Sequence, residues 1–200
     1  MCCPQRKKKS LFISQKRFNC KIVLPGMGLT AAIYYRTMTG NTKEIALRIS
    51  ELFGGRIKGC YDIVKDGFPD WQKHDILLFG TCTWDIGQLP TGWENLESLL
   101  KDALIRKKKI ALFGLGDQGS YPDSFSDGLG ILYQWFRKAG CKVYGRWPAE
   151  GYTYAFSLAE ENGGFAGLVL DEHQQPELSE TRMKIWVEQL KKELNLVGNR

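Results

Sequence analysis

Short apolar runs of strand length alternate along the chain with segments whose apolar residues recur at helical spacing. The first run covers residues 31–33, and the segment after it places Ile45, Ile49 and Leu52 on one face of a helix. That helix ends at Gly54. The same patterns predict strands at residues 56–63, 75–80, 109–114, 142–145 and 165–170, and helices at residues 93–104, 130–139 and 179–194, with Ser179 as the N-cap of the last helix.

The alternation of strands and helices predicts the fold class. Strands separated by helices of these lengths form a parallel sheet whose two faces are both covered. We therefore predict a three-layer α/β/α sandwich. The residues between Gly145 and Phe165 are mostly polar and aromatic, so we interpret them as an insertion within the last strand and not as a separate domain.

The charge of the chain is distributed unevenly. The 200 residues have a net charge of +6, yet residues 1–26 contain seven basic residues and no acidic one. Subtracting those seven charges leaves −1 for residues 27–200, which excludes the basic surface typical of a nucleic-acid-binding domain. No apolar run approaches the ~20 residues that cross a bilayer. We expect neither a nucleic acid nor a membrane as a partner.

The basic segment at residues 1–26 divides the chain into an extension and a folded domain at residues 27–200. We interpret the extension as a disordered tail or as the product of a start assigned too far upstream, since Met27 directly precedes the first strand. The remaining alternative is an organellar transit peptide, because the segment has no acidic residue. The predicted location is the cytoplasm, or the chloroplast stroma if the extension is a transit peptide.

The spacing of the cysteines along the chain does not match that of a metal site. Six are scattered through the chain without a C-x-x-C pair, and the only histidines, His74 and His173, are isolated from each other. A structural zinc site needs clustered cysteine and histidine ligands, so we expect no metal. Scattered thiols indicate a reducing compartment.

The loop Thr37–Thr42 connects the first strand to the first helix and carries three threonines, a glycine and an asparagine. The free N–H groups and the positive dipole end of the helix favour an anion there. Added hydroxyls make the loop a predicted phosphate cradle. The alternative is an ordinary helix cap, with Asn41 as N-cap and Glu44 completing a capping box. Because no lysine directly follows Gly40, a triphosphate loop is excluded and a monophosphate fits better.

Two further loops follow the third and fourth predicted strands, at residues 81–90 and 115–123. Each is polar, contains glycine and carries one large aromatic residue, Trp84 or Tyr121. Taken singly, each aromatic residue is an ordinary partly buried loop anchor. Ligands of open parallel sheets bind beyond the carboxyl ends of the strands, so the pair predicts a flat ligand held between two rings opposite the phosphate cradle.

The third loop also contains the pattern Gly114-x-Gly116-x-x-Gly119, which formally matches a dinucleotide-binding fingerprint. That fingerprint belongs after the first strand and opens directly into a helix. Here it follows the fourth strand, and Pro122 delays the next helix. We therefore exclude a nicotinamide site at this position.

These loops resemble those of the flavodoxin family, whose members carry flavin mononucleotide (FMN). The similarity covers essentially residues 28–194, and the broken last strand is similar to the long-chain subgroup. The resemblance implies the strand order 2-1-3-4-5, which is already known for flavodoxin sheets. It is carried by Thr37-x-Thr39-Gly40-Asn41-Thr42, Thr83-Trp84-x-x-Gly87-x-Leu89, Gly116-Asp117-Gln118-x-x-Tyr121, Trp147-Pro148-x-Glu150-Gly151-Tyr152, Gly167-Leu168-x-Leu170-Asp171-Glu172 and Trp186-Val187-x-Gln189-Leu190.

The resemblance also implies a role for each matched position. Trp84 and Tyr121 should stack on opposite faces of the flavin ring, and the Asp85–Ile86 peptide should face flavin N5. The backbone near Asp117 and Gln118 should hold the pyrimidine edge. The full set of expected cofactor contacts is Thr37, Met38, Thr39, Gly40, Asn41, Thr42, Thr83, Trp84, Asp85, Ile86, Gly87, Gly116, Asp117, Gln118 and Tyr121.

Two residues depart from the family pattern. Arg36 stands where the family usually has glycine or a small residue, and its side chain either turns outward into solvent or adds a charge to the phosphate site. We favour the outward orientation, because the family's phosphate site needs no cation. Cys82 stands where proline is frequent and is expected to loosen the first flavin loop.

The function implied by the resemblance is electron transfer and not enzymatic catalysis. The chain would be a low-potential one-electron carrier that cycles FMN through quinone, semiquinone and hydroquinone forms, with a stable blue semiquinone. Its partners would be a ferredoxin/flavodoxin–NADP reductase and low-potential acceptor enzymes, and we expect a monomer. The alternatives are an FMN-dependent NAD(P)H:quinone reductase and an interaction module without flavin. The aromatic and acidic stretch at residues 150–161 either assists docking or only covers the sheet edge.

Overall fold

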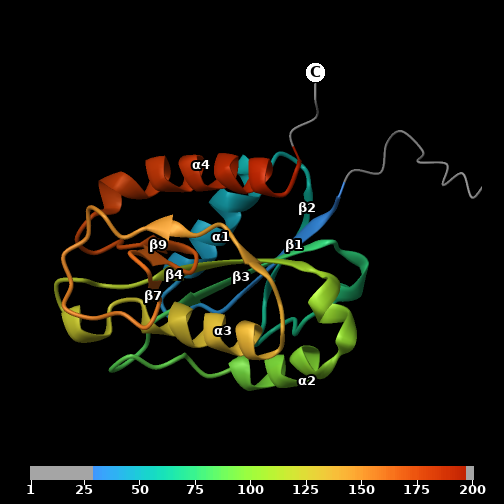
Figure 1. Ribbon diagram of the computed structural model, residues 1–200, viewed down its shortest axis with the longest axis horizontal. Helices are drawn as coiled ribbons and strands as arrows, with labels where there is room; N and C mark the ends of the chain where they lie inside the picture. Colours follow the sequence, from blue (N-terminus) through green and yellow to red (C-terminus); the bar gives the residue numbers. More distant parts are fainter. Residues whose placement is uncertain (1–28, 197–200) are drawn as a thin grey trace, which may run out of the picture.

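A computed structural model describes residues 29–196 of the chain, and the predicted basic extension at residues 1–26 lies outside the described residues. Figure 1 shows a sheet with helices on both of its faces, which confirms the predicted three-layer α/β/α sandwich. Within residues 29–196, no helix has the length and hydrophobicity needed to cross a bilayer.

The sheet has the order β2-β1-β3-β4-β5, and all of its strand pairs are parallel, as predicted. All five residues of β1 are buried, and β3 and β4 are almost entirely buried, because helices cover both faces of these central strands. The edge strand β2 is largely half-buried. The bounds are β1 Ala31–Tyr35, β2 Ile57–Asp62, β3 Ile76–Cys82, β4 Lys109–Leu115 and β5 Val143–Tyr144.

Helices α1 and α4 lie on one face of the sheet, and α2 and α3 lie on the other (Figure 1). Each turns an apolar stripe inward; on α3 the buried residues include Leu129, Leu132 and Phe136. Trp186 of α4 is fully buried, and its indole N–H donates to the carbonyl of Gly145 over 2.7 Å. The helices are α1 Asn41–Leu52, α2 Leu96–Lys101, α3 Asp127–Lys138 and α4 Pro176–Glu193.

The last strand of the sheet is split by the predicted insertion. Its first half, β5, pairs with β4 at Ile110 and Ala111, and its second half, β9 (Leu168–Leu170), pairs with β4 from Phe113 to Leu115. Between them the chain forms a small antiparallel sheet in the order β6-β8-β7. Its strands are β6 Trp147–Pro148, β7 Glu160–Glu161 and β8 Gly164–Phe165.

Two predicted elements were wrong in their extent. Residues 165–170 are not one strand, because Phe165 ends β8 in the small sheet while β9 begins only at Leu168. Residues 93–104 do not form one helix either. Asp102 has extended backbone angles, and its carboxylate accepts a hydrogen bond from the Leu104 N–H over 2.8 Å, which ends α2 and starts a new 3-10 turn. The short 3-10 helices are η1 Trp71–Lys73, η2 Trp93–Asn95, η3 Ala103–Lys107 and η4 Pro122–Ser124.

The predicted cap of the last helix was also wrong. Helix α4 begins at Pro176, a residue suited to a first turn because its missing N–H needs no partner there. Ser179 therefore lies inside the helix, where its hydroxyl donates to the Glu172 carboxylate.

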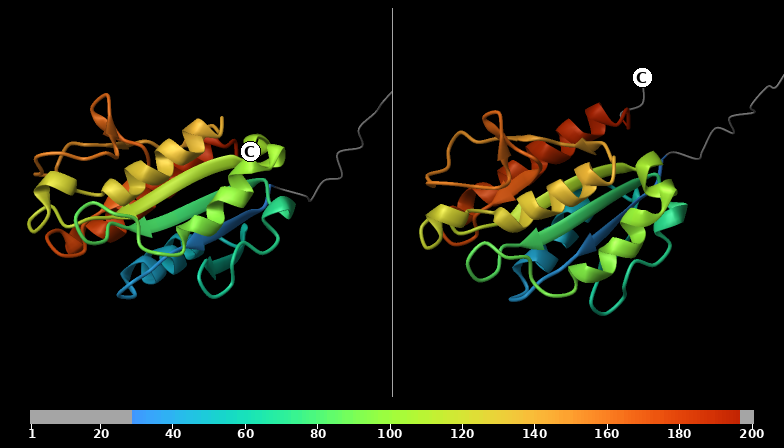
Figure 2. Two further views of the ribbon diagram at one scale, coloured as in Figure 1. Left: turned by 90° about the horizontal axis from the view of Figure 1, so that it is seen from below. Right: turned by 60° about the horizontal axis from the view of Figure 1, so that its bottom comes forward.

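The chain segments that follow β1, β3 and β4 all leave the same edge of the sheet, since parallel strands end on one side. In both views of Figure 2 these three loops lie together at the left end of the sheet. The fold thus brings residues 36–40, 83–90 and 116–126 into one region.

The insertion is fastened to α3 by polar contacts and by close packing. The Glu161 carboxylate accepts hydrogen bonds from Tyr133 over 2.9 Å and Arg137 over 2.6 Å, both on α3. Gly130 lies directly under the insertion backbone, since a Cβ atom added there would lie 2.3 Å from the carbonyl carbon of Leu158. The insertion therefore requires a glycine on this face of the helix.

We expect Gly130→Ala to destabilise the protein. Alanine in a helix normally adds about 1 kcal/mol of stability relative to glycine. Here the clash with the Leu158 backbone should reverse the sign and cost about 1–3 kcal/mol. Urea unfolding monitored by circular dichroism measures this, with Gln134→Ala on the exposed face of α3 as the control. A Gly130→Ala protein as stable as Gln134→Ala would show that the insertion is not held in this way.

Candidate functional site

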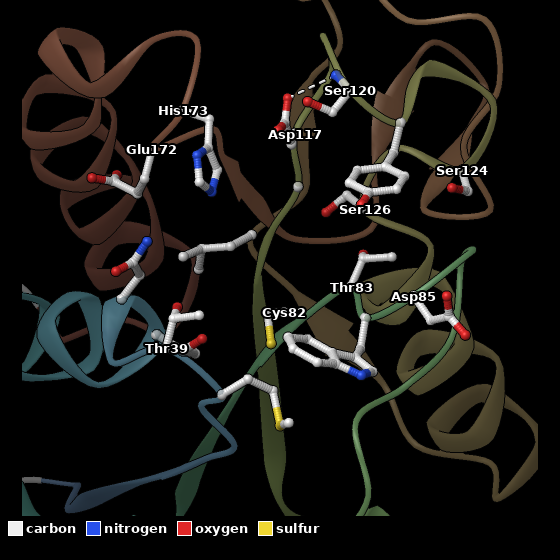
Figure 3. A pocket seen from close by; sticks show the side chains of 17 residues that line it. Thr39, Cys82, Thr83, Asp85, Asp117, Ser120, Ser124, Ser126, Glu172 and His173 are labelled. Carbon is white, nitrogen blue, oxygen red and sulfur yellow. Dashed lines mark hydrogen bonds between the residues drawn. The ribbon is translucent and has the colours of Figure 1, made fainter.

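A cleft of about 640 Å³ opens between the three loops (Figure 3). Thr39, Glu172 and His173 lie toward one end of it, while Asp85 and Ser124 lie toward the other. All three predicted loops contribute to its walls, together with residues from the turn that follows β9. The lining residues are Met38, Thr39, Asn41, Thr42, Cys82, Thr83, Trp84, Asp85, Leu115, Gly116, Asp117, Ser120, Tyr121, Ser124, Ser126, Glu172 and His173.

The first loop is shaped by its own backbone and not by a side-chain cap. Gly40, with φ of 108°, is the N-cap of α1, and its N–H donates to the Thr37 hydroxyl over 2.9 Å. The alternative in which Asn41 caps the helix was wrong, because Asn41 is already the first helical residue. The leading N–H groups of α1 have no partner within the helix, and Asn41 and Thr42 line the cleft. These N–H groups are therefore left free by the helix itself, at the wall of the cleft.

The second loop is a tight turn closed by a pair of backbone hydrogen bonds. The N–H of Trp84 donates to the carbonyl of Gln88 and the reverse bond is also made, each over 2.8 Å. Asp85 and Gly87 both have positive φ inside this turn, at 47° and 77°. As a result Ile86 stands at the tip with 78% of its surface exposed, next to Asp85 of the lining.

The third loop is held by two aspartates. Asp117 accepts hydrogen bonds through Oδ1 from the N–H groups of Gly119 and Ser120 and from the Gln174 side chain. Burial opposes ionisation of Asp117, but the hydrogen bonds from Ser120 and Gln174 and the nearby His173 outweigh it, and the pKa of this carboxyl is lowered. It therefore carries its negative charge inside the cleft at neutral pH.

Gln118 faces into the protein. Its N–H donates to the buried Asp171 carboxylate over 2.9 Å, and its side-chain carbonyl accepts the N–H of Thr153 over 2.5 Å. The Gln118 N–H is therefore occupied, while the expectation that the backbone near Asp117 and Gln118 holds a ligand edge stays a prediction. Among the hydrogen bonds of the described residues, the N–H of Asp117 has no acceptor and remains the available donor.

Two aromatic rings stand on separate loops of the cleft. Trp84 is 44% exposed and Tyr121 is 50% exposed, and both belong to the lining. Neither forms a stacked or edge-to-face pair with another aromatic ring of the described chain. Loop anchors would bury these rings, so their exposure favours a role as the walls of a binding site.

Ten of the fifteen expected contact residues line the cleft. The other five are placed differently: Gln118 points away, and Thr37 and Gly40 shape the first loop through the hydrogen bond between them. Gly87 packs on Asp127, and Ile86 is exposed next to Asp85. The residues outside the lining are Thr37, Gly40, Ile86, Gly87 and Gln118.

Seven lining residues lie outside the expected set of contacts, although Cys82, Leu115 and Ser120 belong to the predicted loops. Most instructive is Ser126, which is fully buried and whose hydroxyl has no hydrogen-bond partner in the part of the chain that the structure describes. Its position next to the third loop was a usable signal, whereas Glu172 and His173 come from a turn that only the tertiary structure brings to the cleft. The seven residues are Cys82, Leu115, Ser120, Ser124, Ser126, Glu172 and His173.

Arg36 and Cys82, which depart from the family pattern, both make defined contacts. The Arg36 side chain turns away from the cleft and donates to the backbone carbonyls of Thr37 and Thr91, the latter over 2.7 Å. Arg36 lies outside the lining, as an outward orientation predicts, but its guanidinium is bonded to backbone carbonyls and is not simply solvated. The Cys82 thiol lines the cleft beside Thr42, and burial raises its pKa, so it stays protonated at neutral pH.

The sequence was compared with known proteins. Residues 33–186 match the family model described as Flavodoxin. The flavodoxin of Synechococcus elongatus is 41% identical over 165 residues, which cover 82% of this chain and 97% of that protein. The chain belongs to the flavodoxin family. Flavodoxin 1 of Escherichia coli is 37% identical over 166 residues, covering 82% of this chain and 94% of that flavodoxin.

A comparison with solved structures agrees with this family. The Fusobacterium nucleatum flavodoxin, solved bound to flavin mononucleotide, has a TM-score of 0.76 and 34% sequence identity. The match covers 82% of this chain and 98% of the other. The insertion between β5 and β9 is consistent with the long-chain type of this family.

Asp127 allows a test of the packing beneath the second loop of this flavodoxin. Its carboxylate accepts the Leu158 N–H over 2.7 Å and lies against Gly87. Burial raises its pKa, although the Leu158 hydrogen bond opposes the shift. The folded state therefore favours the protonated acid, and the wild-type protein loses stability as the pH rises through the folded pKa.

Asp127→Asn keeps the acceptor for Leu158 and cannot ionise. We expect its stability, relative to the wild type, to be higher at pH 7 than at pH 4, with a change below about 1 kcal/mol. Urea unfolding at the two pH values measures this. Asp123→Asn, at an exposed position, serves as the control. If the stability of Asp127→Asn relative to the wild type is instead lower at pH 7 than at pH 4, the ionised carboxylate is stabilising and our account of its environment is wrong.

Proposed function

We propose that this flavodoxin holds FMN in the cleft and acts as a low-potential one-electron carrier. The single observation that supports this most is the arrangement of the cleft. Thr39 and the start of α1 lie at one end, and the exposed rings of Trp84 and Tyr121 belong to the same walls. Its volume of about 640 Å³ lies within the ordinary range of cofactor sites.

Two further features fit a flavin. The buried Ser126 hydroxyl has no partner among residues 29–196, and such a group normally has one, so a polar atom of a ligand would satisfy it. The Asp117 N–H offers a second donor on the third loop. Gly116 in the lining lets the third loop pack closely on the segment that carries Ser126, because a Cβ there would lie 2.7 Å from the Phe125 ring and 2.9 Å from the Ser126 nitrogen. The fifteen contacts expected from the sequence are proposed as the cofactor site on this basis.

The flavin would supply the electron chemistry, and the protein would bind it and set its potential. Thr39, Asn41 and Thr42 would hold the phosphate with hydroxyl and amide groups, without a cation. Trp84 and Tyr121 would hold the ring and exclude water from its faces. The tight turn at Asp85 would present a peptide group to the ring edge. A backbone carbonyl there can accept a hydrogen bond from a protonated ring nitrogen.

Negative charges near the cleft would lower the potential of a bound flavin. Asp85 and Asp117 line it, and Asp123 lies on the neighbouring turn. Placing a negative charge on a nearby ring is disfavoured by each of these carboxylates. Each ~1.4 kcal/mol of such repulsion lowers a one-electron potential by ~59 mV.

Electrons would enter and leave through the exposed rim of the cleft. Trp84, Ile86 and Tyr121 are all exposed there and give a partner direct access to the ring edge. We propose a ferredoxin/flavodoxin–NADP reductase and low-potential acceptor enzymes as the partners, with the carrier as a monomer. The acidic groups around the rim should steer a basic partner surface toward it.

An FMN-dependent NAD(P)H:quinone reductase is the alternative with the same fold. It would need a second nucleotide beside the flavin. In the described part of the chain, the cleft offers one phosphate-binding loop, and its lining contains no arginine or lysine. The carrier is therefore the better fit.

We also propose that residues 27–200 form the flavin-binding domain and that the preceding residues take no part in binding. The proposed location is the cytoplasm, or the chloroplast stroma if residues 1–26 are removed as a transit peptide. N-terminal sequencing of the native protein distinguishes a cleaved extension from a retained one.

We expect Trp84→Ala to weaken FMN binding about tenfold or more, because a stacked aromatic residue contributes about 1–3 kcal/mol. Quenching of flavin fluorescence on titration measures the dissociation constant. Phe156→Ala is the matched control, since Phe156 is an exposed aromatic residue outside the lining. Equal affinities of the two variants would argue against the proposed ring site.

The carrier function is tested by reduction kinetics. With NADPH alone, the FMN-loaded protein should be reduced negligibly, because no second nucleotide site is proposed. Adding a ferredoxin-type reductase should give rapid reduction that slows as the ionic strength rises from about 0.01 to 0.15 M, since surface charges are then screened. Rapid turnover of NADPH and a quinone without the reductase would support the alternative enzyme instead.

A further inference from the structure

His173 is the only residue in the lining of the cleft whose side chain can become positively charged. Figure 3 shows its imidazole ring directed into the cleft, at the end where Thr39 lies. The neighbouring Glu172 carboxylate points away in that view and accepts the Ser179 hydroxyl. Neither the sequence patterns nor the expected contacts assigned a role to this histidine.

The position of His173 is fixed by a buried carboxylate. Asp171 is fully buried, and its Oδ1 accepts the N–H groups of His173 over 3.0 Å and Gln174 over 2.9 Å. Its Oδ2 accepts the N–H of Gln118 in the third loop. One carboxylate therefore holds the histidine turn and a wall of the cleft in a common geometry, so His173 is positioned by the fold.

The groups that surround the imidazole are acidic or neutral. Asp117 faces it from the third loop and Glu172 precedes it in its own turn, while Asp85 lies toward the far end of the cleft. The first loop contributes only Met38, Thr39, Asn41 and Thr42 to the lining, and none of these side chains is charged. A phosphate on this loop would thus find one potential cation nearby, at His173.

We propose that His173 contacts the phosphate end of bound FMN in a proton-dependent manner, so that the protonated imidazole strengthens binding of the phosphate ester. This inference rests on the proposed function. The imidazolium has two N–H donors and a charge opposite to that of the phosphate, whereas the neutral ring has one donor and no charge. FMN binding and protonation of His173 are then linked, and each favours the other.

The test is the dissociation constant of the full chain for FMN between pH 5.5 and 8.5, measured for the wild type and His173→Gln. The phosphate ester itself ionises with a second pKa of ~6, and this affects both proteins. The ratio of their dissociation constants at each pH therefore reports on the substituted residue. We expect the wild type to bind FMN about fivefold more tightly than the variant at pH 5.5, as for a half-exposed ion pair, and equally at pH 8.5. His74→Gln, which changes the other histidine, next to Thr30 at the opposite end of the sheet, should follow the wild type.

Riboflavin lacks the phosphate, so its binding tests whether His173 contacts that group. The difference between wild type and His173→Gln should vanish for riboflavin at every pH. A constant ratio of FMN affinities across the pH range would overturn the proposal. So would a difference of the same size with riboflavin, since the contact would then be to the ring or the sugar chain.

A second measurement uses the unmutated protein. Nuclear magnetic resonance titration of the two histidine rings, with and without FMN, should show a higher pKa for His173 in the FMN-bound form and no change for His74. An unchanged His173 titration would contradict the proposal even if the variant folded poorly. If no protein in the series binds FMN at all, the proposed carrier function itself fails, which is a separate result.

Discussion

The parallel pairing of β1, β3 and β4 is the constraint on which the rest of this flavodoxin depends. Because these strands run in one direction and are buried on both faces, their carboxyl ends meet at one edge of the sheet. The loops that follow them are therefore neighbours, although they are about 40 residues apart in sequence. The cleft is a consequence of this pairing, and its chemistry depends on what each loop carries.

A different backbone conformation or set of hydrogen bonds holds each loop. Together these interactions keep the ligand-binding groups of the loops available. The first loop is shaped by the positive φ of Gly40, the second by the Trp84–Gln88 pair, and the third by Asp117 and Asp171. These interactions satisfy part of the loop backbone internally. They leave the first turn of α1, the Asp117 N–H and the Ser126 hydroxyl for a ligand. Such fixed, unpaired donors can bind a cofactor without reorganising the protein.

The sequence predicted the layers of the fold and the three loops because their signals are local. Buried strands and amphipathic helices have distinct periods, and polar residues after a strand mark its carboxyl end. The errors also have local causes. Asp102 offered an alternative hydrogen bond that interrupted the helix after Lys101, and Pro176 began α4 before Ser179. The resemblance to flavodoxins supplied the strand order, which no periodic pattern contains.

By itself the sequence determined the chemical character of the cleft: hydroxyl and amide groups for a monophosphate, two aromatic rings, and no lysine directly after Gly40. The tertiary structure decided which groups face the cleft. It turned Gln118 inward to Asp171, tied Arg36 to the backbone, and brought Ser126 and His173 to the lining. The physical reason is that residue type and spacing fix local structure, whereas burial and long-range hydrogen bonds decide side-chain direction. Those partners lie up to 55 residues away in the chain.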